Sequence, residues 1–251
     1  MQTVFDVGMY NGSDTEYYLE LGFRVVAVEA NLRFVERARK RFDKELAAGK
    51  LVLVHAAVVD QPGPAVLYLS GDDPGSSSIS REWVESINPA GALEVEGIVY
   101  SSLLSAYGTP YFLKVDIEGA DRHCVLALTS DARPSFLSFE IGPDFDELMA
   151  HVIDIGFNRF KIINQAGFRH IRNEDCLRDR VSRRAMHLLG YGNPTQVRRA
   201  GRFFRSGSSG PVPWQSDGEW TDRDRMLSFW RQYVDAGRDS AWYDIHATRA
   251  A

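Results

Sequence analysis

The chain has 251 residues, 44% of them hydrophobic and 25% charged, which is enough for one full α/β core with an appendage. Its formal net charge of −5 argues against a nucleic-acid partner, because nucleic-acid binders usually carry a basic face. The only two cysteines, Cys124 and Cys176, are far apart and indicate a reducing compartment. No leader-like segment opens the chain and no apolar run is long enough to cross a bilayer, so we expect a cytoplasmic protein without a membrane partner.

The first predicted element is a strand that ends at an acid and runs into a glycine loop. Val4 to Val7 form the strand, Asp6 lies near its end, and Gly8 and Gly12 flank the loop before a helix. Such loops bring a ligand close to the backbone in nucleotide-binding α/β proteins. The third glycine of a dinucleotide loop is missing, and Asp6 would repel phosphate and suit a cation. S-adenosylmethionine, with an adenosine at one end and a positive amino-acid portion at the other, therefore fits better than a dinucleotide.

The second predicted strand, residues 24–29, also ends in an acid. Glu29 follows Gly8 by 21 residues, the spacing at which a carboxylate accepts hydrogen bonds from ribose hydroxyls. Asn31 is then predicted to cap a single helix that ends at Gly49. The alternative is that both acids are solvated strand ends of an unrelated α/β protein.

Strands and helices then alternate along the chain. We predict core strands at residues 50–57, 110–116, 135–141 and 159–164, a strand of an added hairpin at 65–69 and another edge strand at 94–99. We also predict a helix that follows Ile117-Glu118-Gly119 and ends at residues 131–134, and a helix that ends at Gly156. Alternation of this kind favours an α/β fold with a doubly wound, mostly parallel sheet.

The C-terminal third has a different composition. Residues 169–205 contain ten arginines, residues 206–211 are rich in Ser and Gly, and a helix is predicted from about Thr221. We predict a cap at residues 167–240, inserted before a last strand at 241–248, within a single domain that spans 1–251. The arginines form either a solvated helix face or an electropositive rim that attracts an anionic acceptor.

Several motifs together resemble the FkbM family of S-adenosylmethionine-dependent methyltransferases, over about residues 3–165. They are Phe5 to Gly8, Gly12, Asp14-Thr15, Tyr18-Leu19, Val28 to Asn31, serines 76–78, Leu113 to Asp121 and Ser138 to Glu140. The resemblance implies a class I methyltransferase (Rossmann-like) fold with a seven-stranded sheet whose last strand is antiparallel. It also implies transfer to hydroxyl groups of sugars or natural products. The common family loop has Ala-Asn after its first glycine, whereas this chain has Met9-Tyr10 and only then Asn11.

We expect the cofactor site to lie at the carboxyl ends of the strands. The residues predicted to bind S-adenosylmethionine are Asp6, Gly8, Asn11, Gly12, Glu29, Ala30, His55, Ala56, Ser78 and Asp116. His55 and Ala56 end the third core strand and would border the adenine. The serine loop either lines the cofactor or substrate or is simply flexible.

The predicted catalytic residues are Asp116, Glu118 and His246. The two acids follow the fourth core strand, at the switch point of the sheet. One acid could hold the methionine ammonium, one could be the base, or both could bind a divalent metal, an alternative that we do not favour. Glu118 could also be an ordinary first-turn helix acid. His246 shares a strand face with Asp244 and is either structural or an alternative base.

The leading interpretation is an S-adenosylmethionine-dependent O-methyltransferase that acts on a small molecule, such as a sugar or a natural-product scaffold. The acceptor could be anionic or carrier-bound. An NAD-dependent oxidoreductase and a non-catalytic binding protein with a methyltransferase fold are the alternatives. A nucleic-acid methyltransferase is supported only by the arginine run.

Overall fold

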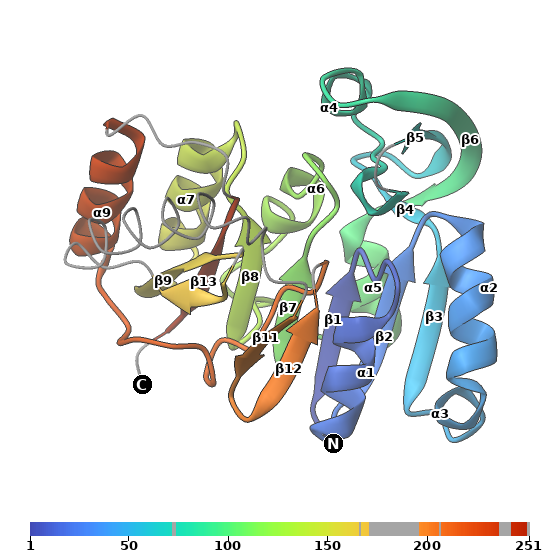
Figure 1. Cartoon of the computed structure of the whole chain (residues 1–251), viewed down its shortest axis with the longest axis horizontal. Coiled ribbons are helices and arrows are strands. Elements are labelled where there is room, and N and C mark those ends of the chain that lie inside the picture. The colour runs from blue at the N-terminus through green and yellow to red at the C-terminus, as the bar shows by residue number, and fades with distance from the viewer. Residues whose placement is uncertain (72–73, 166, 171–195, 206, 236–241, 250–251) are drawn as a thin grey trace, which may run out of the picture. The chain divides into compact units, whose positions relative to one another are not determined.

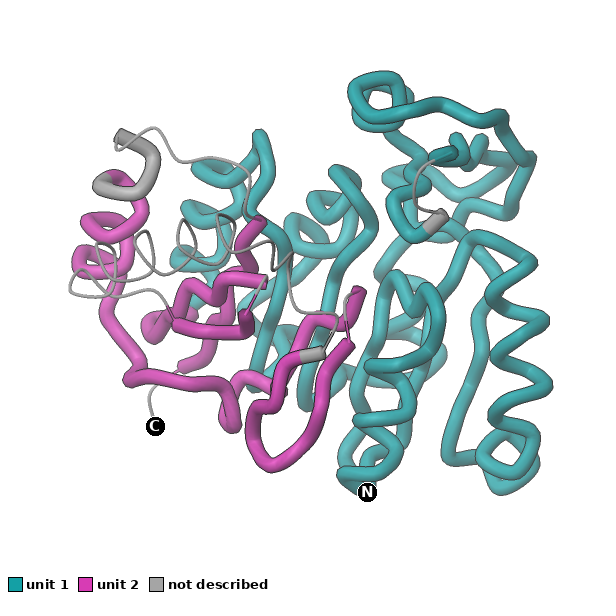
Figure 2. Tube along the Cα trace, in the orientation of Figure 1, with its two compact units in different colours: residues 1–156 teal, residues 157–251 magenta. Residues whose placement is uncertain are grey.

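The computed structural model describes residues 1–71, 74–165, 167–170, 196–205, 207–235 and 242–249. The chain divides into two compact units, Met1–Gly156 and Phe157–Ala251 (Figure 2). Cys176 and the arginines between 172 and 184 lie outside the described residues. The single domain with a cap at 167–240 stays a prediction.

A sheet of parallel strands forms the centre of the first unit. Its order is β8-β7-β1-β2-β3 (Figure 1), and each of these neighbouring pairs is parallel. The bounds are β1 Thr3–Val7, β2 Arg24–Glu29, β3 Leu51–His55, β7 Phe112–Val115 and β8 Phe136–Glu140. The structure confirms the predicted doubly wound α/β sheet, with each strand within a few residues of its expected place.

Helices cover both faces of this sheet, as the alternation of side chains along a strand requires. Phe5 of β1 packs edge-on against Tyr100 of α5 (Tyr100–Tyr107), with ring centroids 6.4 Å apart. Phe112 pairs in register with Val4, the neighbour of Phe5, and meets Tyr18 of α1 (Ser13–Glu20) at 5.6 Å. Neighbouring strand positions point to opposite faces, so α1 lies on one face and α5 on the other (Figure 1).

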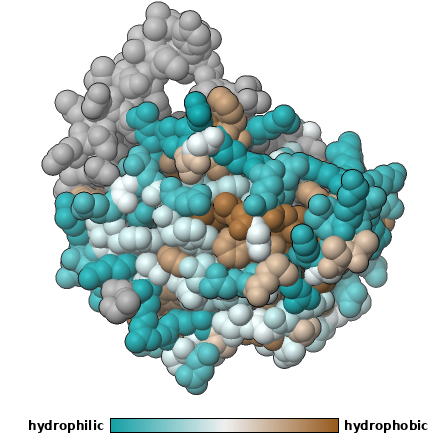
Figure 3. Space-filling view, turned by 90° about the horizontal axis from the view of Figure 1, so that it is seen from below, coloured by the Kyte–Doolittle hydropathy of each residue, from teal (hydrophilic) through white to brown (hydrophobic). Residues whose placement is uncertain are grey.

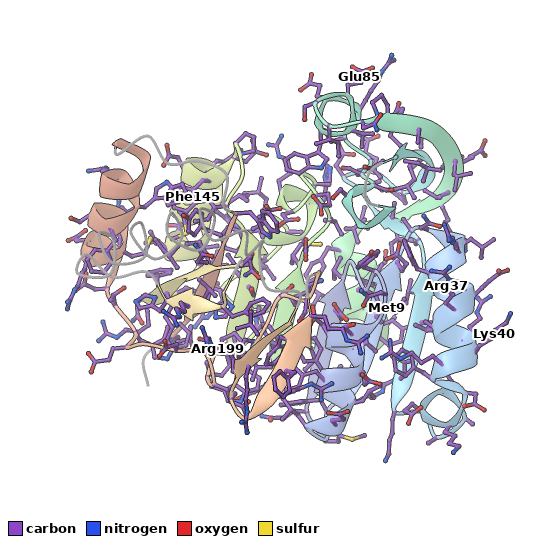
Figure 4. The ribbon with its side chains drawn as sticks, in the orientation of Figure 1. Met9, Arg37, Lys40, Glu85, Phe145 and Arg199 are labelled. Carbon is purple, nitrogen blue, oxygen red and sulfur yellow. The ribbon has the colours of Figure 1, made fainter. Side chains whose placement is uncertain are left out.

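The helix predicted after β2 is broken in two. The Asn31 side chain caps α2 (Leu32–Arg41) as predicted, by accepting a hydrogen bond from the Arg33 N–H. Arg37 and Lys40 of α2 point away from the sheet (Figure 4). The buried Phe42 has a non-helical backbone, and α3 (Asp43–Ala47) begins after it. The Phe42 ring packs against Gly12, since a Cβ added at Gly12 would lie only 2.9 Å from this ring. This contact accompanies the break between α2 and α3.

A small second sheet lies above the carboxyl ends of β2 and β3 in Figure 1. It contains β4 (Ala57–Val58), β5 (Gly63–Ser70) and β6 (Pro89–Ile98), in the order β4-β6-β5, with η1 (Pro74–Ser76) and α4 (Arg81–Glu85) between β5 and β6. The antiparallel pairing of β5 with β6 confirms the predicted hairpin.

The last helices of the first unit are α6 (Arg122–Val125) and α7 (Phe145–Asp154). α7 confirms the predicted helix before Gly156. α6 is far shorter than the helix predicted to follow Gly119. The chain between β7 and α6 forms a loop in which Glu118 (φ 55) and Gly119 (φ 80) have left-handed backbones that no α-helix accepts.

The second unit has its own antiparallel strands. β13 (Tyr243–Thr248) pairs antiparallel with β9 (Arg159–Asn164), which confirms the predicted antiparallel last strand. β10 (Arg169–His170) also pairs with β9 and was not predicted, so the described strands are not limited to the seven expected. The other elements among the described residues of this unit are a separate hairpin, β11 (Gln196–Arg199) with β12 (Arg202–Arg205), and helix α9 (Arg223–Asp235).

The surface drawn in Figure 3 is largely hydrophilic, with hydrophobic residues gathered near its centre. Within the described ranges, no helix combines the length and the apolar character that crossing a membrane requires.

Candidate active site

A cavity in the first unit opens where the carboxyl ends of β1, β2 and β7 meet the small sheet. The space inside it is about 560 Å³, counted with the open solvent at its mouth. Seven predicted site residues line it, namely Gly8, Glu29, Ala30, Ala56, Ser78, Asp116 and Glu118. The other five, Asp6, Asn11, Gly12, His55 and His246, are not among its lining residues.

Glu29 is fixed at the end of β2 by backbone donors on both sides. Its Oε2 accepts a hydrogen bond from the Tyr10 N–H at 2.8 Å, and its Oε1 accepts one from the Asn31 N–H at 2.7 Å. Burial raises the pKa of Glu29 to about 7, although these two hydrogen bonds favour the charged form. Each carboxylate oxygen keeps a lone pair that could accept a hydrogen bond from a ligand hydroxyl.

The glycine loop lies between β1 and the loop after β7. Gly8 has a left-handed backbone with φ of +85°, and a Cβ there would lie 1.8 Å from the Asp116 carbonyl oxygen. Only glycine permits this approach. Tyr10 and Glu118 are the non-glycine residues with positive φ in the described part of the first unit, and both line the cavity. Strained backbone of this kind gathers at functional sites.

A buried ion-pair network lies directly behind the cavity. Lys114 Nζ donates a hydrogen bond to the Gly8 carbonyl oxygen at 2.7 Å, and it lies 3.4 Å from Asp6 Oδ1 and 3.5 Å from Asp116 Oδ2. Burial acts to lower the pKa of Lys114, but the charges of Asp116 and Asp6 outweigh it, so this pKa lies above its usual range. The lysine therefore stays charged and ties β1 to β7.

Asp6 belongs to this network and does not face the cavity. It is fully buried and accepts a hydrogen bond from the Thr15 hydroxyl. Burial raises the pKa of Asp6, while Lys114 and Thr15 act to lower it. The positive charge that pairs with Asp6 is therefore the Lys114 ammonium of the chain itself. The predicted contact between Asp6 and a cofactor stays a prediction.

Two further acids, which sequence reasoning did not single out, lie beside Asp116. Asp121 accepts hydrogen bonds from the Ile117 N–H at 2.9 Å and from the Glu140 N–H at 3.0 Å, so it joins the loop after β7 to the end of β8. Burial, followed by the charge of Asp116, raises the pKa of Asp121 to about 6. Burial, followed by the charges of Asp116 and Asp121, raises the pKa of Glu140 to about 8. Both residues belong to the motifs on which the family resemblance rests. That resemblance was the sequence signal that could have identified them as site residues.

Asn11, Gly12 and His55 surround the site without lining it. The Asn11 side chain accepts a hydrogen bond from the Ser13 N–H at 2.9 Å, at the start of α1. Gly12 is the left-handed N-cap of that helix. His55 Nε2 lies 3.1 Å from the Ala30 carbonyl oxygen, so it contacts the backbone of a residue that does line the cavity.

The serine loop is pinned to the small sheet. Ser78 forms two backbone hydrogen bonds with Tyr68 of β5, at 2.8 and 3.0 Å, and its hydroxyl accepts one from the Ser80 N–H. Ser77 and Ser78 line the cavity. These bonds favour the interpretation of a lining loop over that of a free one.

His246 is buried in the second unit. Its Nδ1 lies 3.2 Å from Ser216 Oγ, which also accepts a hydrogen bond from Lys161 Nζ. Burial, followed by the charges of Lys161 and His170, lowers the pKa of His246 to about 3. The ring is therefore neutral at ordinary pH, and its catalytic role stays a prediction.

Metal ligation was an open alternative for Asp116 and Glu118. Within the ranges that the structure describes, no group of three or more His, Cys, Asp or Glu residues is arranged to hold a metal ion.

Comparison with known proteins places the chain in a family. Residues 6–169 match the family model described as the methyltransferase FkbM domain. The chain is 36% identical to a probable ribosomal RNA small subunit methyltransferase A of Methanospirillum hungatei JF-1 over 75 residues, which are 30% of this chain and 29% of that protein.

Two solved structures are also similar. A methyltransferase FkbM from Methylobacillus flagellatus KT is 14% identical, with a TM-score of 0.42, over 61% of this chain and 37% of that one. A SAM-dependent methyltransferase from Thiobacillus denitrificans, solved with S-adenosyl-L-homocysteine, is 12% identical, with a TM-score of 0.38, over 99% of this chain and 85% of that one.

The chain spans well under half of the ribosomal RNA methyltransferase and of the Methylobacillus protein. The family match, in contrast, covers well over half of this chain and includes both strand-end acids and the glycine loop. It confirms the predicted resemblance, and the parallel sheet agrees with the class I methyltransferase fold that the resemblance implied. The chain belongs to the FkbM methyltransferase family.

Proposed function

We propose that this chain transfers a methyl group from S-adenosylmethionine to a hydroxyl group of a small molecule. The observation that carries the proposal is that Glu29 and Asp116 line one cavity. Glu29 ends β2 and Asp116 follows β7, the two strands that flank β1. None of the described residues that line this cavity is a lysine or an arginine. Two carboxylates in a cavity that no lysine or arginine lines suit a positively charged ligand. They disfavour the negatively charged pyrophosphate of NAD.

The residues present fit the parts of S-adenosylmethionine. The Glu29 carboxylate can accept hydrogen bonds from the ribose hydroxyls, and the apolar side chains of Ala56, Leu67 and Ile79 offer a wall for the adenine. Asp116 can hold the ammonium group. When bound, the cofactor supplies a methyl group activated by a sulfonium.

The chain's own task is then to align and dehydrate the reactants. Holding the acceptor oxygen in line with the methyl group contributes several kcal/mol in well-oriented systems. A hydroxyl must also lose its proton, which positioned bases assist by about 10²–10⁴-fold. The acids after β7 support a hydroxyl acceptor for this reason.

The direct test is a methyl-transfer assay with a radiolabelled donor and a panel of methyl glycosides and polyketide alcohols. We expect label in at least one acceptor. Hydride exchange with NAD in place of methyl transfer would favour the oxidoreductase, and cofactor binding without any transfer would favour a non-catalytic protein.

Glu29→Ala is expected to weaken binding of S-adenosylhomocysteine by about 1–3 kcal/mol, the usual cost of losing a charge-assisted hydrogen-bond partner. Ribose hydroxyls favour the carboxylate, so binding lowers the pKa of Glu29 from its free value of about 7. The affinity gain is therefore present above this pH and is lost as the pH falls through it. Glu29→Gln should flatten this pH dependence in fluorescence titrations, and an unchanged affinity in both variants would remove Glu29 from the ribose site.

Asp116→Asn and Glu118→Gln are expected to reduce turnover by about 10²-fold or more, as the loss of a cofactor-holding or proton-accepting group does. Thermal unfolding, compared with that of the exposed-site variant Glu96→Gln, checks that the fold is retained. Wild-type rates in both variants would place these roles elsewhere, with His246 as the first alternative. A chelator added to the wild type tests the metal version, which loss of activity would support.

We further propose that the methyl acceptor is anionic, such as a phosphorylated, carboxylated or carrier-bound molecule. On one face of the β11–β12 hairpin, Arg198 and Arg205 are exposed beside Phe203, which is 62% exposed. We expect the KM for such an acceptor to rise with salt, because exposed charges are screened beyond a Debye length of about 8–10 Å. A flat salt response, with Arg198→Gln equal to wild type, would contradict it.

A further inference from the structure

We propose that Glu140, at the carboxyl end of β8, is the proton acceptor for the hydroxyl that is methylated. The inference rests on the proposed function and assigns a role that Asp116 and Glu118 were expected to fill. It follows from where β8 ends, from the contacts that the carboxylate lacks, and from the charges around it.

The sheet brings Glu140 next to Asp116, one of the residues that line the cavity. β7 and β8 are parallel, with Lys114 opposite Ser138. Continuing this register by two residues sets Glu140 opposite Asp116, and side chains two positions apart point to the same face. Asp116 lines the cavity, so Glu140 lies one strand further along the same edge of the sheet.

Among the described residues, the Glu140 carboxylate has no hydrogen-bond or ion-pair partner. It is largely removed from solvent, yet none of the hydrogen bonds or ion pairs of the described residues involves it. Native proteins rarely bury a carboxylate in this state, because no hydrogen bond or ion pair then offsets the free energy lost on desolvation. Glu140 does not itself line the cavity, but a carboxylate of this kind beside a lining residue such as Asp116 is a candidate for proton transfer.

Its neighbours keep it basic. The charged groups that act on Glu140 are Asp116, after β7, and Asp121, before α6, and both are negative. Lys114, the nearby cation, is engaged with Asp116 and Asp6. Lys114 Nζ lies 3.5 Å from Asp116 Oδ2, whereas none of the ion pairs among the described residues includes Glu140.

Asp121 is the positioning residue. Its two oxygens accept hydrogen bonds from the Ile117 and Glu140 N–H groups, so it fixes the end of β8 against the loop after β7. In the reaction, the acceptor oxygen forms a bond to the methyl carbon as the carbon–sulfur bond breaks, with its electron pair left on sulfur. The hydroxyl proton passes to a Glu140 oxygen.

The test compares wild type, Glu140→Gln, Glu140→Asp and the exposed-site control Glu96→Gln on the full chain. The acceptor is the methyl glycoside or polyketide alcohol that the wild type methylates fastest. We expect Glu140→Gln to lower kcat by about 10²–10⁴-fold while S-adenosylhomocysteine affinity changes less than about twofold. Glu140→Asp should restore part of the rate. Wild-type kcat should rise with pH toward a plateau above about 8, a rise that Glu140→Gln should lose.

A second measurement needs no acceptor. In ¹³C-carboxyl spectra, one carboxyl should titrate near pH 8 in wild type and Glu96→Gln and be absent in Glu140→Gln. If methyl transfer by Glu140→Gln equals wild type with the same pH profile, or Glu140 titrates below pH about 5, the assignment is overturned while the proposed function stands. If the wild type methylates nothing in the panel, the proposed function and the assignment fall together.

Discussion

Replacing Lys114 by methionine is expected to destabilise the first unit by about 3–5 kcal/mol, the usual cost of removing one partner of a buried ion pair. Lys114 is 2% exposed and Asp6 is 0% exposed, so neither solvent nor a counter-ion can replace the lost ammonium. The substitution also removes the hydrogen bond to the Gly8 carbonyl oxygen. Urea unfolding followed by circular dichroism measures the effect as a lower transition midpoint.

The matched control is the double variant Lys114→Met/Asp6→Asn. It removes the buried positive charge together with its fully buried partner, so it should lose less stability than the two single variants combined. Strict additivity, or an unchanged midpoint in Lys114→Met alone, would show that the network does not hold β1 to β7.

Gly8→Ala is expected to cost about 3 kcal/mol or more, because a left-handed residue with a side chain costs about 1–3 kcal/mol and an overpacked contact about 1–3 kcal/mol. The added Cβ would lie 1.8 Å from the Asp116 carbonyl oxygen, so β1 and the loop after β7 must separate. The same separation would move Asp116 in the cavity. Thermal unfolding and S-adenosylhomocysteine affinity should both fall.

Gly22→Ala isolates the backbone contribution. Gly22 has a nearly equal φ of +87°, but a Cβ there meets nothing within 4 Å. It should cost only about 1–2 kcal/mol and leave the affinity unchanged. Equal losses in the two alanine variants would rule out the close approach at Gly8.

Local signals in the sequence were sufficient for much of the fold. The near-continuous apolar run of residues 24–29 is typical of a buried parallel strand, and its bounds agree with β2. Asn31 caps α2 because an Asn before a helix accepts a backbone hydrogen bond within three residues. The position of Glu29 follows from both elements, so its place in the cavity could be predicted.

Contacts between distant residues could not be predicted in this way. Asp6 pairs with Lys114, more than a hundred residues away, and this pairing turns an expected ligand contact into a buried support. The break at Phe42 accompanies the packing of its ring against Gly12, and the loop at Glu118 accompanies the hydrogen bonds by which Asp121 joins two strand ends. The burial of Glu140 depends on residues that are distant in sequence, so a local sequence pattern could not predict it.

The measurement that tests the central claim most directly is a calorimetric titration of the full chain with S-adenosylhomocysteine and, separately, with NAD. The cavity with Glu29 and Asp116 predicts saturable binding of one S-adenosylhomocysteine per chain and no heat of binding with NAD. Binding of NAD, or no binding of S-adenosylhomocysteine by the folded protein, would contradict the account.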